Sequence, residues 1–441
     1  MKLFHASVIL FFFSSCSFDT KSGIWKNENT PDNSIENIVF KDFQKITSSK
    51  KNFNQKISIN QSFNFNINKP IQNNNWEDIF FSKNNNSLNF QYNGENKIIF
   101  KSKKLTKYTT GDYILFKNNN LFLTDEDGNI ISFSINNSEI KKFNFYKKKY
   151  KKIKKILNFI IENNVIYVSD NIGYIYAYNY NENKIIWAKK YKIPFRSNIK
   201  LFSDKIVTSN QNNDFYVFEK KSGNLVKLIP SEETIINNSF INNISLSDDK
   251  IFFLNTYGSL YSIDQNSLKS DWFINFNKFS DLSLSSLFYG SNVINFKNKI
   301  LLSSNQNFYF IDAVNGAVIS KKKFSSFFKP IAVNEYVFLI TKNNYLISMK
   351  LRNGDIIYSY DITQKVANYL NTNKKDLVIK DFMMVNNKLL IFLKNSFVVK
   401  FDIRGEIEEV FKLPSSLKTR PIIVNNSLMY LNKKNRFLIR N

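Results

Sequence analysis

Short stretches of alternating apolar and polar residues recur along the chain, and the clearest of them runs from Val165 to Lys189. Ile166 and Val168 stand two residues apart, as do Ile175 and Ala177, and this is the period that buries one face of a pleated strand. Asn and Gly interrupt the pattern where tight turns need left-handed backbone. The stretch therefore predicts an antiparallel meander of three strands: Val165 to Ser169, Tyr174 to Asn179 and Lys184 to Lys189.

The same unit is repeated through the rest of the chain, in eight copies. Aligned on the residue that ends the middle strand, successive copies lie about 40 to 50 residues apart, the length of a four-stranded propeller blade. Phe, Tyr, Ile and Val dominate the apolar positions, which favours strands. We therefore expect an all-β protein with an eight-bladed β-propeller over residues 70–441. The aligned column is Ser134, Asn179, Glu219, Asp264, Asp312, Lys350, Asp402 and Asn441.

The eighth copy reaches only its third strand at Asn441. A blade without its outer strand leaves an unpaired edge, which folded proteins avoid. The strand-like stretch Lys97–Lys101 precedes the first copy. We therefore expect this N-terminal strand to pair with the last blade and close the ring.

The first residues differ in character from the repeats. An apolar run from Leu3 to Phe13 is too short to span a membrane and is typical of a signal peptide over residues 1–15. Ser14 and Ser15 before Cys16 resemble the lipobox of bacterial lipoproteins, although Phe13 stands where that motif usually has Leu, and the resemblance implies lipidation of Cys16. The alternative is ordinary secretion with a dispensable cysteine.

Residues 16–69 are polar and rich in Asn, Lys and Ser, without sustained periodicity. We interpret this stretch as a tether between the lipid and the propeller. Two pieces of it, Lys56–Ile59 and Phe63–Ile67, alternate apolar with polar residues, which is compatible with a place on the domain surface.

The amino-acid composition excludes several classes of partner and of chemical site. The net charge is +26, but Lys supplies nearly all of it, whereas recognition of bases and phosphates favours the forked guanidinium of Arg. We therefore expect no nucleic-acid partner. The one His and the one Cys lie at His5 and Cys16. Their position excludes a disulfide framework, a Cys or His zinc site and a histidine general base in the rest of the chain.

Two kinds of charged cluster remain. Pairs of carboxylates, at Asp125 and Asp127 and at Asp248 and Asp249, stand at turn positions where Asp normally binds its own backbone, so we expect neither a metal site nor a catalytic site. Lys147–Lys155 reads KKKYKKIKK. It is either a solvated connection between blades or a contact for anionic lipid head groups or an acidic partner.

Several copies resemble the PQQ-like repeat of quinoprotein propellers. The matching residues are Asp127-Gly128, Gly258 to Asp264, Asp312 to Gly316 and Ile186-Trp187. With eight such copies and the cysteine motif before them, the chain resembles the BamB family, the lipoproteins of the outer-membrane β-barrel assembly machine. Trp187 and Trp272 stand where the repeat has its stacking Trp. We expect Trp187 to pack between neighbouring blades.

The resemblance implies a non-enzymatic scaffold with no cofactor and no metal. In the family, loops between the third and fifth blades dock onto the periplasmic POTRA domains of the barrel-inserting subunit. The regions that match the contact elements give four candidate docking residues, of which Asp281 matches a family aspartate and Ser283 replaces another: Ile236, Asn238, Asp281 and Ser283. The alternative is that both stretches are plain connections between blades.

The implied location is the periplasmic face of the outer membrane, where the chain is held by its lipid and is monomeric within a hetero-complex. Two other functions stay open. PQQ-dependent dehydrogenases resemble the chain in blade pattern, but they need an adjacent-cysteine pair, which is absent, and a calcium cage. The second is a peptide- or polysaccharide-binding propeller outside the assembly machine.

Overall fold

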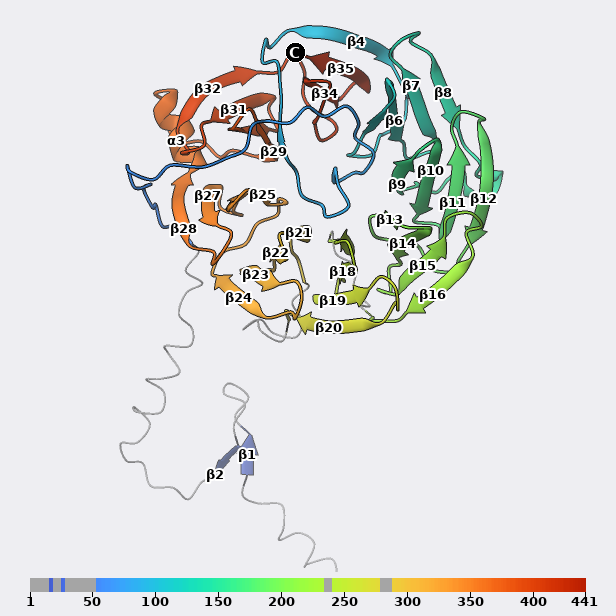
Figure 1. The fold of residues 1–441 in the computed structure, drawn as a ribbon, viewed down its shortest axis with the longest axis horizontal. Helices are drawn as coiled ribbons and strands as arrows, with labels where there is room; N and C mark the ends of the chain where they lie inside the picture. Colours follow the sequence, from blue (N-terminus) through green and yellow to red (C-terminus); the bar gives the residue numbers. More distant parts are fainter. Residues whose placement is uncertain (1–15, 19–24, 28–52, 234–239, 278–287) are drawn as a thin grey trace, which may run out of the picture. The chain divides into compact units, whose positions relative to one another are not determined.

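The strands expected from the repeats form a ring of blades in the computed structural model of the chain (Figure 1). The chain divides into two units, Met1–Lys51 and Asn52–Asn441. In the first unit, two short strands pair antiparallel: β1 (Cys16–Phe18) and β2 (Trp25–Asn27). The structure describes residues 16–18, 25–27, 53–233, 240–277 and 288–441.

Among the described residues of the second unit, eight antiparallel sheets run outward from the axis of the ring, and each is one blade. The first blade contains β5 (Leu115–Lys117), β6 (Asn120–Thr124), β7 (Ile130–Ser134) and β8 (Ile140–Phe143). The second contains β9 (Leu157–Glu162), β10 (Val165–Asp170), β11 (Tyr174–Asn179) and β12 (Lys184–Lys190). The third contains β13 (Lys200–Phe202), β14 (Lys205–Ser209), β15 (Phe215–Glu219) and β16 (Leu225–Ile229). The fourth contains β17 (Asn243–Leu246), β18 (Lys250–Leu254), β19 (Ser259–Asp264) and β20 (Ser270–Asn275).

The remaining blades follow the same order from inner to outer strand. The fifth contains β21 (Ile294–Phe296), β22 (Lys299–Ser303), β23 (Phe308–Asp312) and β24 (Val318–Lys322). The sixth contains β25 (Ile331–Val333), β26 (Tyr336–Ile340), β27 (Tyr345–Lys350) and β28 (Ile356–Asp361). The seventh contains β29 (Ile379–Val385), β30 (Lys388–Leu393), β31 (Phe397–Phe401) and β32 (Ile407–Lys412), with β3 (Asn89–Phe90) added in parallel to β29. The eighth contains β33 (Ile422–Val424), β34 (Ser427–Leu431), β35 (Arg436–Arg440) and β4 (Ile98–Lys104).

The ring closes as the sequence predicts. β4, from before the first blade, pairs antiparallel with β35, near the end of the chain, and Leu438 stands opposite Lys101. The eighth blade therefore takes its outer strand from the N-terminal side of the propeller. The all-β, eight-bladed expectation is confirmed for the described residues.

The middle strands of the blades are buried on both faces, not on one. In β10 the apolar Ile166 and Val168 are fully buried, and Tyr167, which points to the other face, is only 7% exposed. Because each blade packs between two others, both faces of its inner strands meet a neighbour. The two-residue alternation in the sequence therefore marks strands, but it does not separate a core face from a solvent face.

Aromatic side chains lock neighbouring blades together. Trp187 of the second blade lies over Gly223 in the last turn of the third, and its Nε1 donates a hydrogen bond to the Lys220 carbonyl at 2.8 Å. A Cβ on Gly223 would lie 2.3 Å from the Trp187 ring. Trp272 of the fourth blade covers Gly316 of the fifth in the same way. Trp187 packs between blades, as expected.

The two ends of the ring carry different loops. One end, which we call the hairpin face, carries the turns between the first and second and between the third and fourth strands of each blade. The other, the connection face, carries the links from the outer strand of one blade to the inner strand of the next. These links include η1 (Lys148–Tyr150) and α3 (Ile362–Tyr369). Among the described residues, no helix is long and apolar enough to cross a membrane.

Candidate partner-binding surfaces

The axis of the ring is occupied by the chain's own residues 73–90, which we call the axial segment (Figure 1). Its backbone and side chains hydrogen-bond to the inner strand of each described blade, or to the residue beside it, in the order of the ring. The pairs are Asn73 with Ile423, Trp76 with Phe116, Glu77 with Ile161, Asp78 with Lys200, Asn85 with Ile244 and with Val293, Asn86 with Ala332, and Phe90 with Asn386.

Asparagine amides make the most buried of these contacts. The Nδ2 of Asn85 donates to the carbonyls of Ile244 at 2.9 Å and Val293 at 2.8 Å, bridging the fourth and fifth blades. Asn86 pairs with both backbone groups of Ala332, at 2.7 and 3.0 Å. A buried amide without partners would cost free energy, so these bonds fix the position of the segment. The axis is therefore a packed part of the fold.

A buried ion pair holds the same segment to the third blade. The Nζ of Lys200 lies 2.6 Å from Oδ2 of Asp78 and donates a second bond to the Ser82 carbonyl at 2.7 Å. Both side chains are almost fully buried. Burial lowers the pKa of Lys200, and the charge of Asp78 opposes that shift. Removing either partner would leave an unpaired buried charge, so the ion pair fixes the axial segment to the third blade.

A small polar cavity lies beside the axial segment at the connection face. It has a volume of about 40 Å³ and is lined in part by Lys329, Asp381 and Arg420. Asp381 and Arg420 form an ion pair at 3.4 Å, while burial raises the pKa of Asp381. Burial also lowers the pKa of Lys329 to about 7. The cavity has room for about a water molecule, not for a cofactor.

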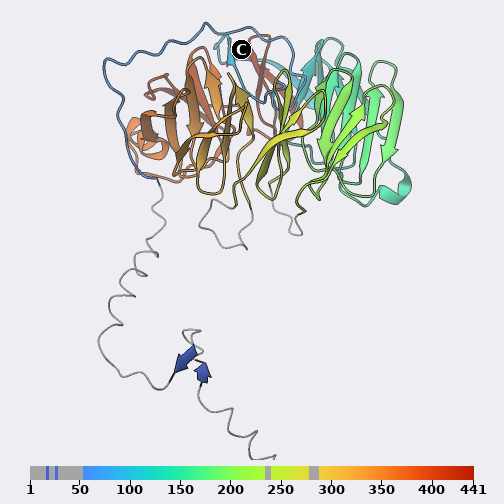
Figure 2. The same ribbon diagram turned by 60° about the horizontal axis from the view of Figure 1, so that its bottom comes forward.

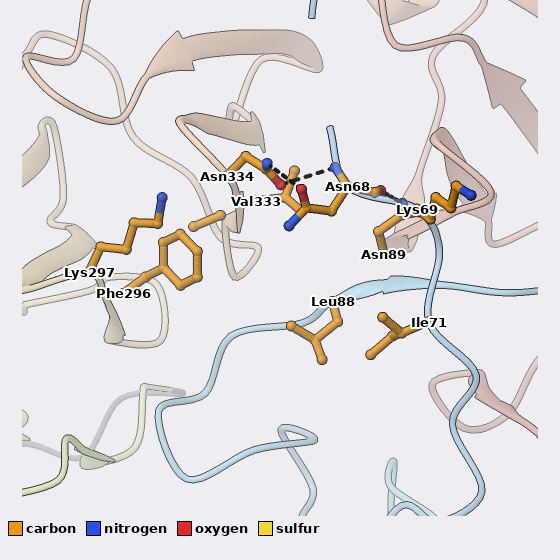
Figure 3. Close-up of a pocket in the computed structure, with 10 residues that line it drawn as sticks. Asn68, Lys69, Ile71, Leu88, Asn89, Phe296, Lys297, Val333 and Asn334 are labelled. Carbon is orange, nitrogen blue, oxygen red and sulfur yellow. Dashed lines mark hydrogen bonds between the residues drawn. The ribbon is translucent and has the colours of Figure 1, made fainter. Parts of the chain in front are cut away.

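A larger cavity of about 220 Å³ lies at the hairpin face, between the chain before β3 and the turns of the fifth and sixth blades (Figure 3). Figure 3 shows Ile71 and Leu88 on one side and Phe296 on another. Asn68 and Asn334 are joined by a 3.0 Å side-chain hydrogen bond that borders it. The lining is mainly apolar, so the cavity suits an apolar side chain.

The outer strands share a β-bulge. In the second to seventh blades, one extra residue of the outer strand interrupts its pairing with the third strand. Bulges of this kind twist an edge and discourage uncontrolled pairing with other chains. The bulged residue is apolar in four of these blades: Ile186, Val226, Ile319 and Ile357.

The third blade has the most exposed apolar outer strand of these. In β16, Leu225, Val226 and Leu228 are 44%, 47% and 42% exposed. Phe273 on β20 of the fourth blade is 59% exposed. Large exposed apolar groups along one strand edge mark a surface for another chain.

The sixth blade has its edge covered by residues 53–67, which we call the rim cover. Ile57 forms an antiparallel bridge to Ser359 of β28, with hydrogen bonds of 3.0 and 2.9 Å in the two directions. Phe65 packs its ring on Tyr336 and Phe338, 4.8 and 5.9 Å away between centroids. The two pieces compatible with a place on the domain surface both contribute to this contact.

Comparison with known proteins supports the resemblance to the PQQ-like repeat. Residues 147–360 match a family model described as outer membrane protein assembly factor BamB. These residues therefore carry the PQQ-like repeat that the family model describes. The matched range spans the second to sixth blades and therefore includes the exposed strand β16. Among curated proteins, none matches the sequence significantly.

Solved structures share the fold of this propeller. BamB from Moraxella catarrhalis aligns with a TM-score of 0.61 at 10% identity, over 78% of this chain and 99% of that one. A europium-containing methanol dehydrogenase aligns with a TM-score of 0.58 at 10% identity, over 83% and 89%. The computationally designed protein Ika8 gives 0.54 at 9% identity, over 77% and 99%. At these identities the likeness shows the propeller fold alone.

The residues singled out from the sequence fall in different places. Ile236, Asn238, Asp281 and Ser283 lie outside the described residues. Their connections, from β16 to β17 and from β20 to β21, belong to the BamB-family range. Cys16 begins β1 in the first unit.

The carboxylates singled out earlier bind neighbouring groups. Oδ1 of Asp125 accepts the backbone N–H groups of Asp127 and Asn129, both at 3.1 Å. Asp248 pairs with Lys83 at 2.6 Å. Within the described part of the chain, no three carboxylate, cysteine or histidine side chains gather as metal ligands.

Sequence reasoning missed the path of the axial segment, and of the rim cover it found only the two alternating pieces. Both segments are rich in Asn, and the apolar residues of the axial segment are too sparse to show a strand or helix period. The signal that exists is local: Trp76, Phe80 and Phe81 stand within a polar run, and large apolar residues in such a run need a packing partner.

Proposed function

We propose that this BamB-family propeller is a non-enzymatic scaffold of the outer-membrane β-barrel assembly machinery. It binds the periplasmic domains of the barrel-inserting subunit through the outer edge of the third blade and the neighbouring connections. The proposal rests on the family match over residues 147–360 and on the exposed groups within that range.

The exposed strand β16 is the observation that carries the docking assignment. Its outer edge has no neighbouring strand among the described residues, and three of its five residues expose apolar side chains. An extended segment of a partner can add to such an edge through main-chain hydrogen bonds, while apolar pockets give the specificity. The proposed contact residues Ile236 and Asn238 come soon after this strand, and Asp281 and Ser283 lie in the connection that follows the fourth blade.

The proposal includes a lipid anchor on Cys16 and a place on the periplasmic face of the outer membrane. Labelled palmitate incorporated by the wild type and not by Cys16→Ser would support the anchor. Equal labelling of both chains, or no labelling of either, would contradict it.

Absence of catalysis is part of the proposal. A quinone-dependent enzyme needs a site for its cofactor, whereas residues 73–90 are packed along the axis of this propeller. Purified protein supplied with pyrroloquinoline quinone and Ca²⁺ should turn over no alcohol. Turnover above the protein-free rate would contradict the scaffold assignment.

An affinity pull-down tests the docking directly. The full chain should capture the barrel-inserting subunit from solubilised envelopes, identified by mass spectrometry. Val226→Glu with Leu228→Glu should lose that subunit, because charge on the edge opposes apolar contact. Ile98→Glu with Ile99→Glu is the matched control on the outer strand of the eighth blade, where these residues are 44% and 54% exposed. Capture that survives the β16 change, or is lost equally in the control, would refute the assigned edge.

A further inference from the structure

Residues 147–156, the basic segment, form a firmly attached projection on the connection face, beside the second blade (Figure 2). Tyr150 within η1 is buried, and the Lys190 amine donates a hydrogen bond to its hydroxyl. The same amine lies over the rings of Tyr150 and Tyr174, 4.9 and 5.1 Å from their centroids. Lys190 therefore pins the middle of the segment to the blade.

The far end of the basic segment is fixed as well. Lys155 is only 4% exposed, and its backbone N–H donates to the Glu126 carbonyl at 2.9 Å. Asn171 receives the Ile156 N–H on its side-chain oxygen at 2.8 Å and donates to the Lys154 carbonyl at 3.0 Å. These bonds hold the segment in one conformation, so the entropy cost of ordering it on a ligand is already met by the fold.

The projection presents mostly unpaired positive charge. Within the described residues, Lys154 is the only lysine of the segment with an ion pair, to Glu126 at 3.0 Å. Five more are exposed without a carboxylate partner there: Lys147, Lys148, Lys149, Lys151 and Lys152. Like charges packed this closely repel one another, and an anionic surface would relieve that repulsion.

Exposed isoleucines accompany the lysines. Ile153 is 46% exposed and Ile156 is 65% exposed, although both lie in a segment of fixed conformation. An acidic protein surface would pair with the lysines but gives no reason for the isoleucines. The interface of a phospholipid bilayer accepts both, because lysine amines reach the phosphates while apolar side chains enter the acyl boundary.

We propose that the basic segment binds the surface of a membrane that contains anionic phospholipid. Its lysines contact the phosphates, and Ile153 and Ile156 enter the interface. The contact is independent of the β16 edge and of any lipid on Cys16, so it holds whether or not the proposed docking does.

Vesicle co-sedimentation tests this contact. The full chain carrying Cys16→Ser is mixed with vesicles of phosphatidylcholine alone or mixed with phosphatidylglycerol. It should bind the anionic vesicles more tightly, and added salt should weaken that binding. Replacing Lys148, Lys151 and Lys152 together by Gln should lower the affinity for the anionic vesicles about a hundredfold, as expected for three lysines near a charged surface.

A charge-matched control separates the segment from the overall charge. Lys221, Lys269 and Lys350 are exposed on hairpin-face turns or beside them, and changing all three to Gln removes the same net charge. This control should keep wild-type affinity. Ile153→Ser with Ile156→Ser should weaken binding and leave its salt dependence unchanged. Equal loss in both lysine triples, or no preference for anionic vesicles, would overturn the proposal, as would retained vesicle binding in the Lys148, Lys151 and Lys152 triple.

Discussion

The outer strands of the third and sixth blades hold the same place in the repeat and meet different surroundings. Val226 and Ile357 are the bulged residues of β16 and β28, yet Val226 is 47% exposed and Ile357 only 8%. Ile357 shares a core cluster with residues of α3 and of the rim cover, and the rim cover also bridges to Ser359 at the edge of the sixth blade. A covered edge and an open edge thus exist within one ring.

The covered edge shows what the open edge can accept. Ile57 adds to β28 through two main-chain hydrogen bonds, and aromatic residues of the cover fill the space beside it. The bulge does not prevent this addition. By the same geometry, β16 can take an extended segment of a partner, with Leu225 and Leu228 in place of the apolar groups that the cover meets.

The turn before each of the two outer strands packs against the preceding blade. Substitutions in these turns should give the largest loss of stability. Gly223 and Gly354, in the turns before β16 and β28, have φ of +69° and +70°, and a Cβ would lie 2.3 Å from Trp187 and 2.9 Å from Phe310 respectively. Either Gly→Ala change should lower the free energy of unfolding by about 3 kcal/mol through backbone strain and overpacking. Urea denaturation of each variant measures it.

Gly94 is the control for that pair. Its φ is +76°, but a Cβ there would meet nothing within 4 Å. Gly94→Ala should therefore cost only the backbone strain, about 1 kcal/mol. Equal losses at all three glycines would mean that the ring contacts between blades contribute little.

Weakening the rim cover should open the edge of the sixth blade, so that it resembles the open edge of the third. Phe65→Ala deletes a half-buried ring that packs on Tyr336 and Phe338, and it should lower the free energy of unfolding by about 2 kcal/mol. Hydrogen exchange of β28 amides should also quicken. Phe273→Ala on β20, where the ring is 59% exposed, should change stability by less than about 0.5 kcal/mol.

A smaller, pH-dependent effect is expected at the basic segment, which is pinned by side chains and not by a cover. The hydrogen bond from Lys190 lowers the pKa of Tyr150 to about 8. Between pH 8 and the unfolded value near 10, the unfolded chain keeps a proton that the folded chain has lost. Stability from this group therefore rises with pH across that window and is lost as pH falls through 8.

Absorbance titration of tyrosinate measures this step. Tyr150→Phe should remove it, and Lys190→Met should move it to higher pH. An unchanged titration curve in both variants would show that Tyr150 does not ionise early.

Much of the ring could be predicted because each blade repeats a local pattern. The middle strand of the repeat is the third strand of each blade. The residues aligned from the sequence end that strand in the first six blades, and in the last two they lie one residue beyond it, at Asp402 after β31 and at Asn441 after β35. Turn residues with positive φ make these ends visible in sequence. The strand that closes the ring could be predicted because the eighth copy lacks an outer strand and a spare strand precedes the first copy.

The candidate surfaces could not be predicted in the same way, because they depend on the paths of the axial segment and the rim cover, and the short alternating pieces of the rim cover do not reveal which blade they meet. Alternation predicted strands at β16 and β28 equally, and only the path of residues 53–67 decides which edge is open. Asn85 and Asn86 look like loop residues in sequence, yet they bind backbone groups of three blades. Contacts between residues so distant in the chain leave no local signal.

Hydrogen exchange of the full chain, with and without the periplasmic domains of the barrel-inserting subunit, tests whether a partner adds to β16. The partner should slow exchange in β16, and β28, already bridged by Ile57, should change little. Unchanged exchange in β16 on a bound partner, or protection confined to other blades, would contradict it.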